Sequence, residues 1–341
     1  MLMCTLPRGG SGTTDMSGFE PPPDGRPVVV RTSFVLHDIN DIDDETETFE
    51  FAGVLTLRWH DPRLAFDPVE ANVREKVYTG NYQFNEISPG WYPQVVLVNE
   101  SGFYQSNGVS LRVEPDGTAT LVQTLNATAE VDLVLRRFPF DTQRLYVVFE
   151  VLGFDNNEVR LETEPGIAIL DEGIEIPQWS IMGATASIHD RIAPYAGATG
   201  ITPALVTIID VERRSFHVVR LVVFPLIVIV LLSFAVFWMD RSTLGDRIAV
   251  SFIGILTAVS YLFLISGIVP NIAYFTLIHG FTNVSFLTMC ATVVINLLVG
   301  AMDKRGRQAA GDSIDRRCRW IFPLAYFGIL LAMTGVAYVF F

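Results

Sequence analysis

Cysteine is scarce in this chain of 341 residues, which contains only Cys4, Cys290 and Cys318. Cys290 lies in an apolar segment and Cys318 lies two residues before another, so the sequence offers no disulfide framework. Basic residues are also few, because 24 Lys and Arg stand against 37 Asp and Glu, a net charge of −13. An acidic surface repels nucleic acid, so we expect no nucleic-acid partner.

Catalytic patterns are missing as well. The chain has no Ser/His/Asp order, no metal-ligand spacing and no phosphate-binding glycine loop. We therefore expect neither an enzyme activity nor a cofactor or a metal.

Four long apolar segments fill the last third of the chain. They run over His217–Met239, Ile248–Val269, Phe275–Ala301 and Trp320–Phe341. Each reaches the length of about 20 residues with which a helix crosses the hydrocarbon core of a bilayer. The sequence predicts a transmembrane domain of four helices over residues 214–341, surrounded by lipid.

Charge divides the chain at the same place. Residues 1–213 hold 32 Asp and Glu against 14 Lys and Arg, a net charge of −18, and the remainder hold 5 against 10, a net charge of +5. The basic residues of the last part gather in two connections between apolar segments, at Arg241, Arg247, Lys304, Arg305, Arg307, Arg316, Arg317 and Arg319. Because cytoplasmic loops carry the excess of Lys and Arg, we predict a multi-pass protein of the inner (plasma) membrane with its N-terminal domain and C-terminus outside.

Short β-patterned segments dominate residues 27–213, after a Gly-, Ser- and Pro-rich stretch over 1–26 that we predict to be disordered. The clearest strands are Val28–Leu36, Thr48–Trp59, Gly108–Val113, Thr118–Leu125, Arg144–Leu152 and Leu205–Val211. Pro115-Asp116-Gly117 is a strong turn signal between two of them. The pattern is typical of an antiparallel sandwich, so the predicted fold is an extracellular all-β immunoglobulin-like sandwich followed by a four-helix transmembrane bundle.

One face of the second apolar segment is unusual for a helix in lipid. Steps of three and four residues select Asp246, Ala249, Ile253, Leu256, Ser260, Phe263 and Gly267. Small and polar residues on a spanning helix are better explained by water than by lipid, so this stripe predicts the lining of an ion pore. The alternative is a close helix–helix contact, because small residues also pack membrane helices.

Four motifs then point to a known family. They are Trp59-His-Asp61-Pro-Arg63-Leu64, Trp91-Tyr-Pro93 followed by Asn99, Phe138-Pro139-Phe140-Asp141, and Arg213 placed twelve residues before Pro225. In this order, and followed by four apolar segments, they resemble the pentameric ligand-gated ion channels of the Cys-loop receptor superfamily. Val131 and Leu145 stand where animal receptors have the two loop cysteines, so the chain resembles a prokaryotic member.

The resemblance implies a homopentamer in which five copies of Asp246 form an acidic ring, as in cation channels. Monovalent cations are then the expected permeant ions. Arg247 lies about 100° further round the helix and is expected to point to the subunit interface or the cytosolic rim. Anion-selective members usually carry a Pro-Ala insertion before the equivalent arginine, and Gly245-Asp246-Arg247 has none. Leu256 and Phe263 would form apolar rings that gate the pore by dewetting.

The resemblance also implies a route from the outer domain to the pore. The family's signature loop is the segment between Val131 and Leu145. Its tip, Pro139 and Phe140, is expected to meet the connection Val269–Tyr274, which contains Pro270. Asp44 and Asp141 are expected to flank Arg213 as a partly buried charged cluster. The alternative for Asp44 is a solvated acidic turn over Asp41–Glu47.

The stimulus follows less directly from the sequence. By similarity, Trp91, Glu150 and Tyr195 are candidates for a small-molecule agonist site that suits a cationic amine. Leu152 stands where amine-gated bacterial relatives have an aromatic residue, and the alternative for Trp91 is a core tryptophan. Glu47 aligns with an acidic residue implicated in proton sensing in proton-gated relatives.

The sequence thus predicts a subunit of a homopentameric ligand- or pH-gated cation channel. The alternatives are an anion-selective channel of the same fold and a membrane-anchored binding protein that does not conduct. A single apolar helix would suffice as an anchor, so four spans with a polar stripe argue against the last.

Overall fold

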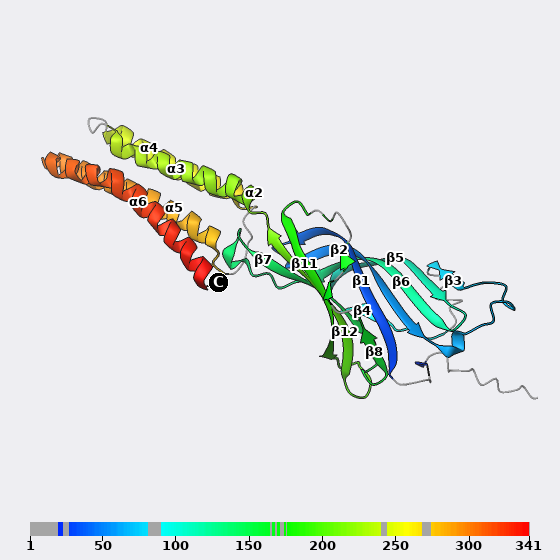
Figure 1. Ribbon diagram of the computed structural model, residues 1–341. Helices are drawn as coiled ribbons and strands as arrows, with labels where there is room; N and C mark the ends of the chain where they lie inside the picture. Colours follow the sequence, from blue (N-terminus) through cyan, green and yellow to red (C-terminus); the bar gives the residue numbers. More distant parts are fainter. Residues whose placement is uncertain are drawn as a thin grey trace, which may run out of the picture.

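The computed structural model describes residues 20–22, 27–80, 90–163, 166–167, 169–170, 174, 176–239, 244–267 and 274–340. In its first domain, buried and exposed side chains alternate along the strands. Two sheets lie face to face, and helices extend from one end of them (Figure 1). The immunoglobulin-like sandwich followed by a helical bundle is therefore confirmed. The segment 1–26 that we predicted to be disordered lies mostly outside the described residues.

The first sheet has seven strands in the order β10-β1-β2-β6-β5-β3, with β8 beside β1. Its strands are β1 (Val28–Asp43), β2 (Thr48–His60), β3 (Lys76–Thr79), β5 (Glu100–Val113), β6 (Thr118–Glu130), β8 (Val159–Glu162) and β10 (Ile169–Leu170). The turn Pro115–Gly117 joins β5 to β6 as predicted, with Gly117 at a positive φ of 90°. Only glycine adopts that conformation without strain.

The second sheet has five strands in the order β4-β7-β12-β11-β9. Its strands are β4 (Val95–Leu97), β7 (Thr142–Val151), β9 (Gly166–Ile167), β11 (Trp179–Ile192) and β12 (Ile201–Arg213). The core lies between the sheets, where the rings of Phe34 and Phe149 approach to 5.2 Å. The sequence did not reveal β11 because polar residues interrupt its apolar alternation, and its pairing with β12 is what orders it.

The motif Trp59–Leu64 closes one end of the sandwich. The buried Asp61 accepts a hydrogen bond from the backbone N–H of Arg63 at 3.0 Å and pairs with the guanidinium of the same residue at 2.8 Å. The backbone N–H of Asp61 donates to the carbonyl of Gly117 at 3.0 Å, which fixes the β5–β6 turn against it. The motif therefore stabilises the β5–β6 turn.

Asn99 joins the two sheets. Its amide donates to the carbonyls of Glu130 in β6 and Tyr146 in β7 at 3.0 and 2.7 Å, and its own oxygen accepts from the N–H of Val148 at 3.2 Å. A single side chain thus satisfies backbone groups of both sheets, which explains why this position of the motif is an asparagine.

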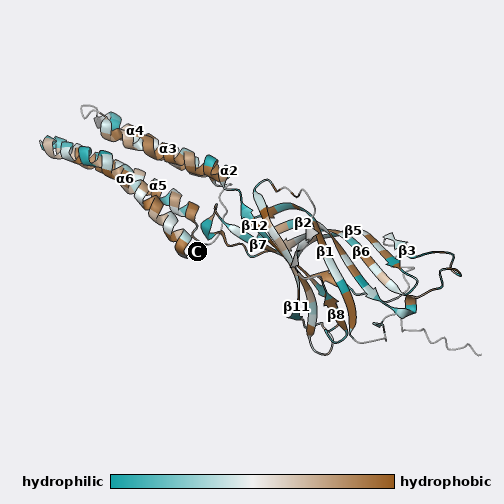
Figure 2. Cartoon of the chain, viewed as in Figure 1, coloured by the Kyte–Doolittle hydropathy of each residue, from teal (hydrophilic) through white to brown (hydrophobic). Residues whose placement is uncertain are grey.

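Four helical spans follow the sandwich, and each is long and apolar enough to cross a membrane. The first consists of α2 (Phe216–Val218), a π-helical turn (Val219–Val223), α3 (Phe224–Phe234) and a 3-10 turn (Ala235–Trp238), and the others are α4 (Leu244–Ile265), α5 (Leu277–Lys304) and α6 (Gln308–Phe340). Apolar residues cover most of their length, as Figure 2 shows. The chain is thus a membrane protein with four spans and an outer β domain.

Two of the expected helices had wrong bounds. The helix expected over 248–269 begins at Leu244 and ends at Ile265. Asp246 in its first turn stabilises this start, because a carboxylate interacts favourably with the positive end of the helix dipole. The fourth helix begins at Gln308 and not near Trp320, so most of the connection between the third and fourth apolar segments is helical. Helix-forming residues in this segment explain the extension, because Gln, Ala and Arg tolerate a helix well.

We predict that Gly53→Ala lowers the stability of the sandwich by about 1–3 kcal/mol, as overpacked cores do. An added Cβ would lie 2.5 Å from Cζ of Phe34 and 2.8 Å from the carbonyl oxygen of Val35. The measurement is the thermal unfolding temperature of the purified protein in detergent. Gly108→Ala is the matched control, because a Cβ there meets no atom within 4 Å. An equal loss in both variants would contradict the packing argument.

Candidate functional site

The predicted pore stripe lies on the open face of α4. All seven stripe residues are exposed in the single chain, and the exposed fractions of Ile253, Leu256 and Phe263 are 62%, 67% and 77%. The opposite face packs inside the bundle through the buried Ser251, Ala258 and Ile265. The stripe is therefore not a contact within the subunit. It is free for water, lipid or a second subunit.

Arg247 does not point where the sequence suggested. It is fully buried within its own subunit, where its guanidinium pairs with Asp315 of α6 at 3.1 Å and donates to Asn296 of α5 at 3.2 Å. The expectation of an interface or rim position was wrong because the helical extension of α6 brings a carboxylate to this level of the bundle.

Arg213, the last residue of β12, is held by two carboxylates at the junction of the domains. Its Nε donates to Asp141 at 2.9 Å, and its Nη1 and Nη2 donate to the two oxygens of Asp44 at 2.8 and 2.7 Å. Asp141 also accepts from Gln143 at 2.6 Å. Asp44 thus belongs to the charged cluster and not to a fully solvated turn.

Aromatic rings complete the enclosure of this guanidinium. The carbon Cζ of Arg213 lies 4.0 Å from the ring of Trp179 and 4.8 Å from that of Phe138. Burial raises the pKa of Asp44 above its ordinary value, although the attraction of Arg213 opposes the rise. Burial opposes the charge of Arg213 too, but the two carboxylates outweigh it and raise the pKa of the guanidinium.

The signature loop rests on the helices. The hydroxyl of Tyr274, just before α5, accepts from the N–H of Leu135 at 2.9 Å and donates to the carbonyl of Leu133 at 3.1 Å. The guanidinium of Arg137 lies 5.5 Å from the ring of Tyr338 near the end of α6. The C-terminal end of α6 accordingly lies beside the sandwich in Figure 1.

The tip of the loop has one buried and one exposed residue. Pro139 is buried, whereas Phe140 is 41% exposed and available to another surface. Among the described residues between α4 and α5, Tyr274 contacts this loop through its hydrogen bonds to Leu133 and Leu135. Pro270 lies outside the described residues.

The structure brings Glu150 and Tyr195 together. The phenol of Tyr195 donates to Oε1 of the buried Glu150 at 2.6 Å, and this bond raises the pKa of the phenol. Nε of Arg191 lies 3.7 Å from the other carboxylate oxygen. The acidic position already has a cationic neighbour from its own subunit, which the sequence analysis did not anticipate.

Trp91 does not join that pair, and its assignment as a ligand-contacting residue needs correction. Its ring is buried in the core, edge-on to Trp59 at 6.1 Å and to Phe154 at 5.9 Å. The apolar interior of the sandwich holds the indole, so the side chain serves as a core tryptophan.

Glu47 occupies a strained turn between β1 and β2. Its φ is +53°, and its carbonyl accepts from the N–H of Val131 at 2.9 Å. The side chain is half-buried, three residues from Asp44. A non-glycine residue at this φ costs energy that the surrounding contacts have to offset.

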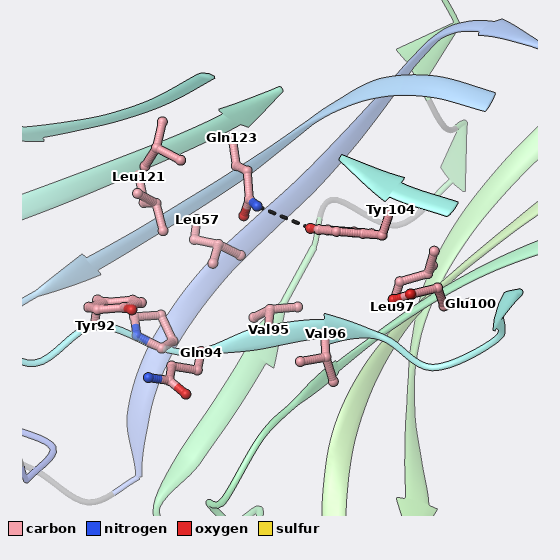
Figure 3. Close-up of a pocket in the computed structure, with 12 residues that line it drawn as sticks. Leu57, Tyr92, Gln94, Val95, Val96, Leu97, Glu100, Tyr104, Leu121 and Gln123 are labelled. Carbon is pink, nitrogen blue, oxygen red and sulfur yellow. Dashed lines mark hydrogen bonds between the residues drawn. The ribbon is translucent and has the colours of Figure 1, made fainter. Parts of the chain in front are cut away.

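A cavity of about 370 Å³ opens between β4 and the first sheet (Figure 3). Tyr104 and Gln123 share a hydrogen bond of 3.0 Å at its wall, and burial beside Glu100 raises the pKa of Tyr104. The cavity is lined by Leu57, Tyr92, Pro93, Gln94, Val95, Val96, Leu97, Glu100, Tyr104, Val109, Leu121 and Gln123. It does not include Glu150 or Tyr195, but two of its residues, Tyr92 and Pro93, belong to the motif Trp91-Tyr-Pro93.

Sequence reasoning missed the partners that complete each cluster. These are Trp179 and Gln143 at the domain junction, Arg191 beside Glu150, and Asp315 beside Arg247. None lies in a recognisable motif.

Comparison with known proteins gives consistent findings. The profile of the family described as neurotransmitter-gated ion-channel ligand binding domain matches residues 17–215. The proton-gated ion channel of Gloeobacter violaceus is 26% identical over 96% of this chain and 87% of its own length. The human gamma-aminobutyric acid receptor subunit rho-3 is 25% identical over 84% of this chain, and the Caenorhabditis elegans acetylcholine-gated chloride channel subunit acc-1 is 24% identical over 72%.

The animal relatives are longer, since the alignments span 62% and 52% of those two proteins. The matched profile covers the whole sandwich, and the helices continue the alignment with the bacterial channel. Family and relatives are ion channels and not enzymes. The chain therefore belongs to the family of neurotransmitter-gated ion channels, with an extracellular ligand-binding domain and four membrane spans.

Proposed function

We propose that the chain is a subunit of a homopentameric cation channel, opened by protons or a small ligand, with α4 lining the pore. The observation that carries the proposal is the open stripe of α4. It exposes Asp246 and Ser260 in a largely apolar helix, and lipid gives no reason to keep polar groups there.

A ring of subunits explains why this helix is so little covered. In the single chain 17% of the α4 window and 11% of the α6 window are buried, against 39% for the first and third spans. In a ring, neighbouring copies would cover the flanks of α4 and leave the stripe to water. The rings of Leu256 and Phe263 are then the candidate gate, because a narrow apolar ring expels water and stops conduction.

Asp246 favours cations. Five copies would place a ring of carboxylates at the cytoplasmic end of the pore, and the outer domain adds a net charge of −18 above it. Both attract cations and repel anions. The second candidate, an anion-selective channel, is favoured by the likeness to a chloride channel subunit, but a carboxylate ring at the mouth opposes it.

Two stimuli remain open. Protons are supported by the likeness to a proton-gated channel and by the acidic residues Glu47 and Asp44 in one turn. A small ligand would bind near Glu150 and Tyr195, where it has to displace or accommodate Arg191. That cationic neighbour weakens the case for a simple amine.

Coupling is proposed to run through the domain junction. Arg213 ends the last strand just before the first span, and both Asp44 and Asp141 hold it in place. Pro139 and Phe140 at the loop tip, together with Pro270 beyond α4, complete the proposed contact between the sandwich and the helices. A movement of the sandwich would then displace the outer ends of the spans.

The first test concerns selectivity. Asp246→Asn should lower cation conductance, most strongly at low salt, because screening lengths grow to about 30 Å at 0.01 M ionic strength. The measurement is single-channel conductance across a salt series in planar bilayers. Asp303→Asn on α5 is the control for a general change of cytoplasmic charge. Reversal potentials that report chloride permeation in the unmodified channel would contradict the proposal.

The second test is a double-mutant cycle on Asp141→Asn and Arg213→Gln, reading the stimulus for half-activation. Loss of one partner of a buried pair costs about 3–5 kcal/mol, so each single substitution should impair opening strongly. The coupling energy should be about 1–3 kcal/mol.

The exposed pair Arg144–Asp210, at 3.2 Å on the same sheet, is the matched control for this cycle. Its coupling should stay below about 1 kcal/mol, as is usual for surface pairs. Additive effects at Asp141 and Arg213 would remove the pair from the coupling route.

The third test uses the raised pKa of Asp44. The carboxylate of Asp44 binds a proton more readily in the folded state than in the unfolded chain. Its protonation therefore stabilises the fold fully at a pH below the pKa of Asp44 in the unfolded chain, and this stabilisation is lost as the pH rises through the pKa of Asp44 in the folded state. Asp44→Asn imitates the protonated form, and Arg213 keeps Asp141 as its counter-charge in this variant. It should therefore unfold at or above the temperature of the wild type near neutral pH, and the difference should shrink on acidification.

Thermal unfolding across a pH series measures that difference. Glu45→Gln is the control, since Glu45 is exposed in the same turn. A difference that grows on acidification would reverse the assigned sign.

A further inference from the structure

A buried polar network links three helices at the cytoplasmic end of the bundle. Nη1 and Nη2 of Arg247 donate to the two oxygens of Asp315 at 3.1 and 3.2 Å, a bidentate pair between α4 and α6. Nη2 also donates to Asn296 of α5 at 3.2 Å. The amide of Asn296 donates to Ser251 at 2.9 Å, and that hydroxyl donates to the carbonyl of Arg247 at 2.9 Å.

The network confines Arg247 tightly. The side chain is fully buried, and Nε has no hydrogen-bond partner within the part of the chain that the structure describes. A buried guanidinium needs a carboxylate, because an unpaired charge in a low dielectric is strongly unfavourable. Asp315 is the carboxylate that the described residues offer to this guanidinium.

The position of Arg247 makes this pairing relevant to the pore. It follows Asp246 directly, so both lie in the first turn of α4, about 100° apart round the helix. Asp246 is exposed on the stripe, whereas Arg247 is turned into the bundle. A free guanidinium at this level would cancel the negative charge of each Asp246.

We infer that Asp315 of α6 is a selectivity-determining residue, which neutralises Arg247 and holds it inside the subunit so that Asp246 alone sets the charge of the cytoplasmic mouth. The inference rests on the proposed function, since it takes α4 as the pore-lining helix. It assigns a role in ion selection to a helix that does not line the pore. Bidentate geometry on Asp315 orients the fork of the guanidinium away from the stripe.

The experiment measures reversal potentials of the full-length channel in a NaCl gradient. The wild type should be cation-selective. In Asp315→Asn the guanidinium loses its counter-charge, so each subunit contributes no net charge to the mouth in place of one negative charge. The sodium-to-chloride permeability ratio should fall at least roughly tenfold, because the negative charge that concentrates cations at the mouth is cancelled.

Asp312→Asn is the matched control. Asp312 is exposed on α6 one turn before Asp315, so its loss removes the same charge from the cytoplasmic surface. Its permeability ratio should equal that of the wild type. The double variant Arg247→Gln with Asp315→Asn removes both charges of the pair and should return to the wild-type ratio.

If Asp315→Asn does not reach the membrane, tagged variant subunits are co-expressed with wild-type subunits and purified through the tag. Every purified channel then holds at least one variant subunit, and the ratio should fall with the share of variant. An unchanged ratio in variant or mixed channels overturns the inference, and so does an equal fall in Asp312→Asn. Chloride selectivity of the wild type would instead overturn the proposed function.

Discussion

Among the residues that the structure describes, two arginines are buried, and each is paired with at least one carboxylate. Arg213 sits between Asp44 and Asp141 at the junction of the domains, and Arg247 sits against Asp315 at the far end of the bundle. A guanidinium cannot give up its charge, so it fixes the positions of the groups that neutralise it. These two clusters tie together segments that are far apart in sequence.

The two clusters lie in different surroundings and are completed differently. Arg213 is enclosed by the rings of Trp179 and Phe138, so cation–π attraction adds to the ion pairs. Arg247 has amide and hydroxyl partners on neighbouring helices, the arrangement by which polar groups are usually accommodated in a membrane. One cluster lies at the junction of the domains, and the other holds the inner end of α4 against α6.

The motifs that identify the family mostly do structural tasks. Asp61 and Arg63 clasp the β5–β6 turn, Asn99 joins the two sheets, and Trp91 fills the core. Arg191 lies outside these motifs, with its Nε 3.7 Å from a carboxylate oxygen of Glu150.

The sequence by itself determined the sandwich, the four spans and the stripe of α4, because each follows from a local period of 2 or about 3.6 residues or from a long apolar run. It also indicated Arg213 as the centre of a charged cluster. Only the tertiary structure decided the direction of Arg247, the core position of Trp91 and the helical start of α6 at Gln308. Those features depend on contacts between residues such as Arg247 and Asp315, which are 68 positions apart, and a local pattern carries no information about them.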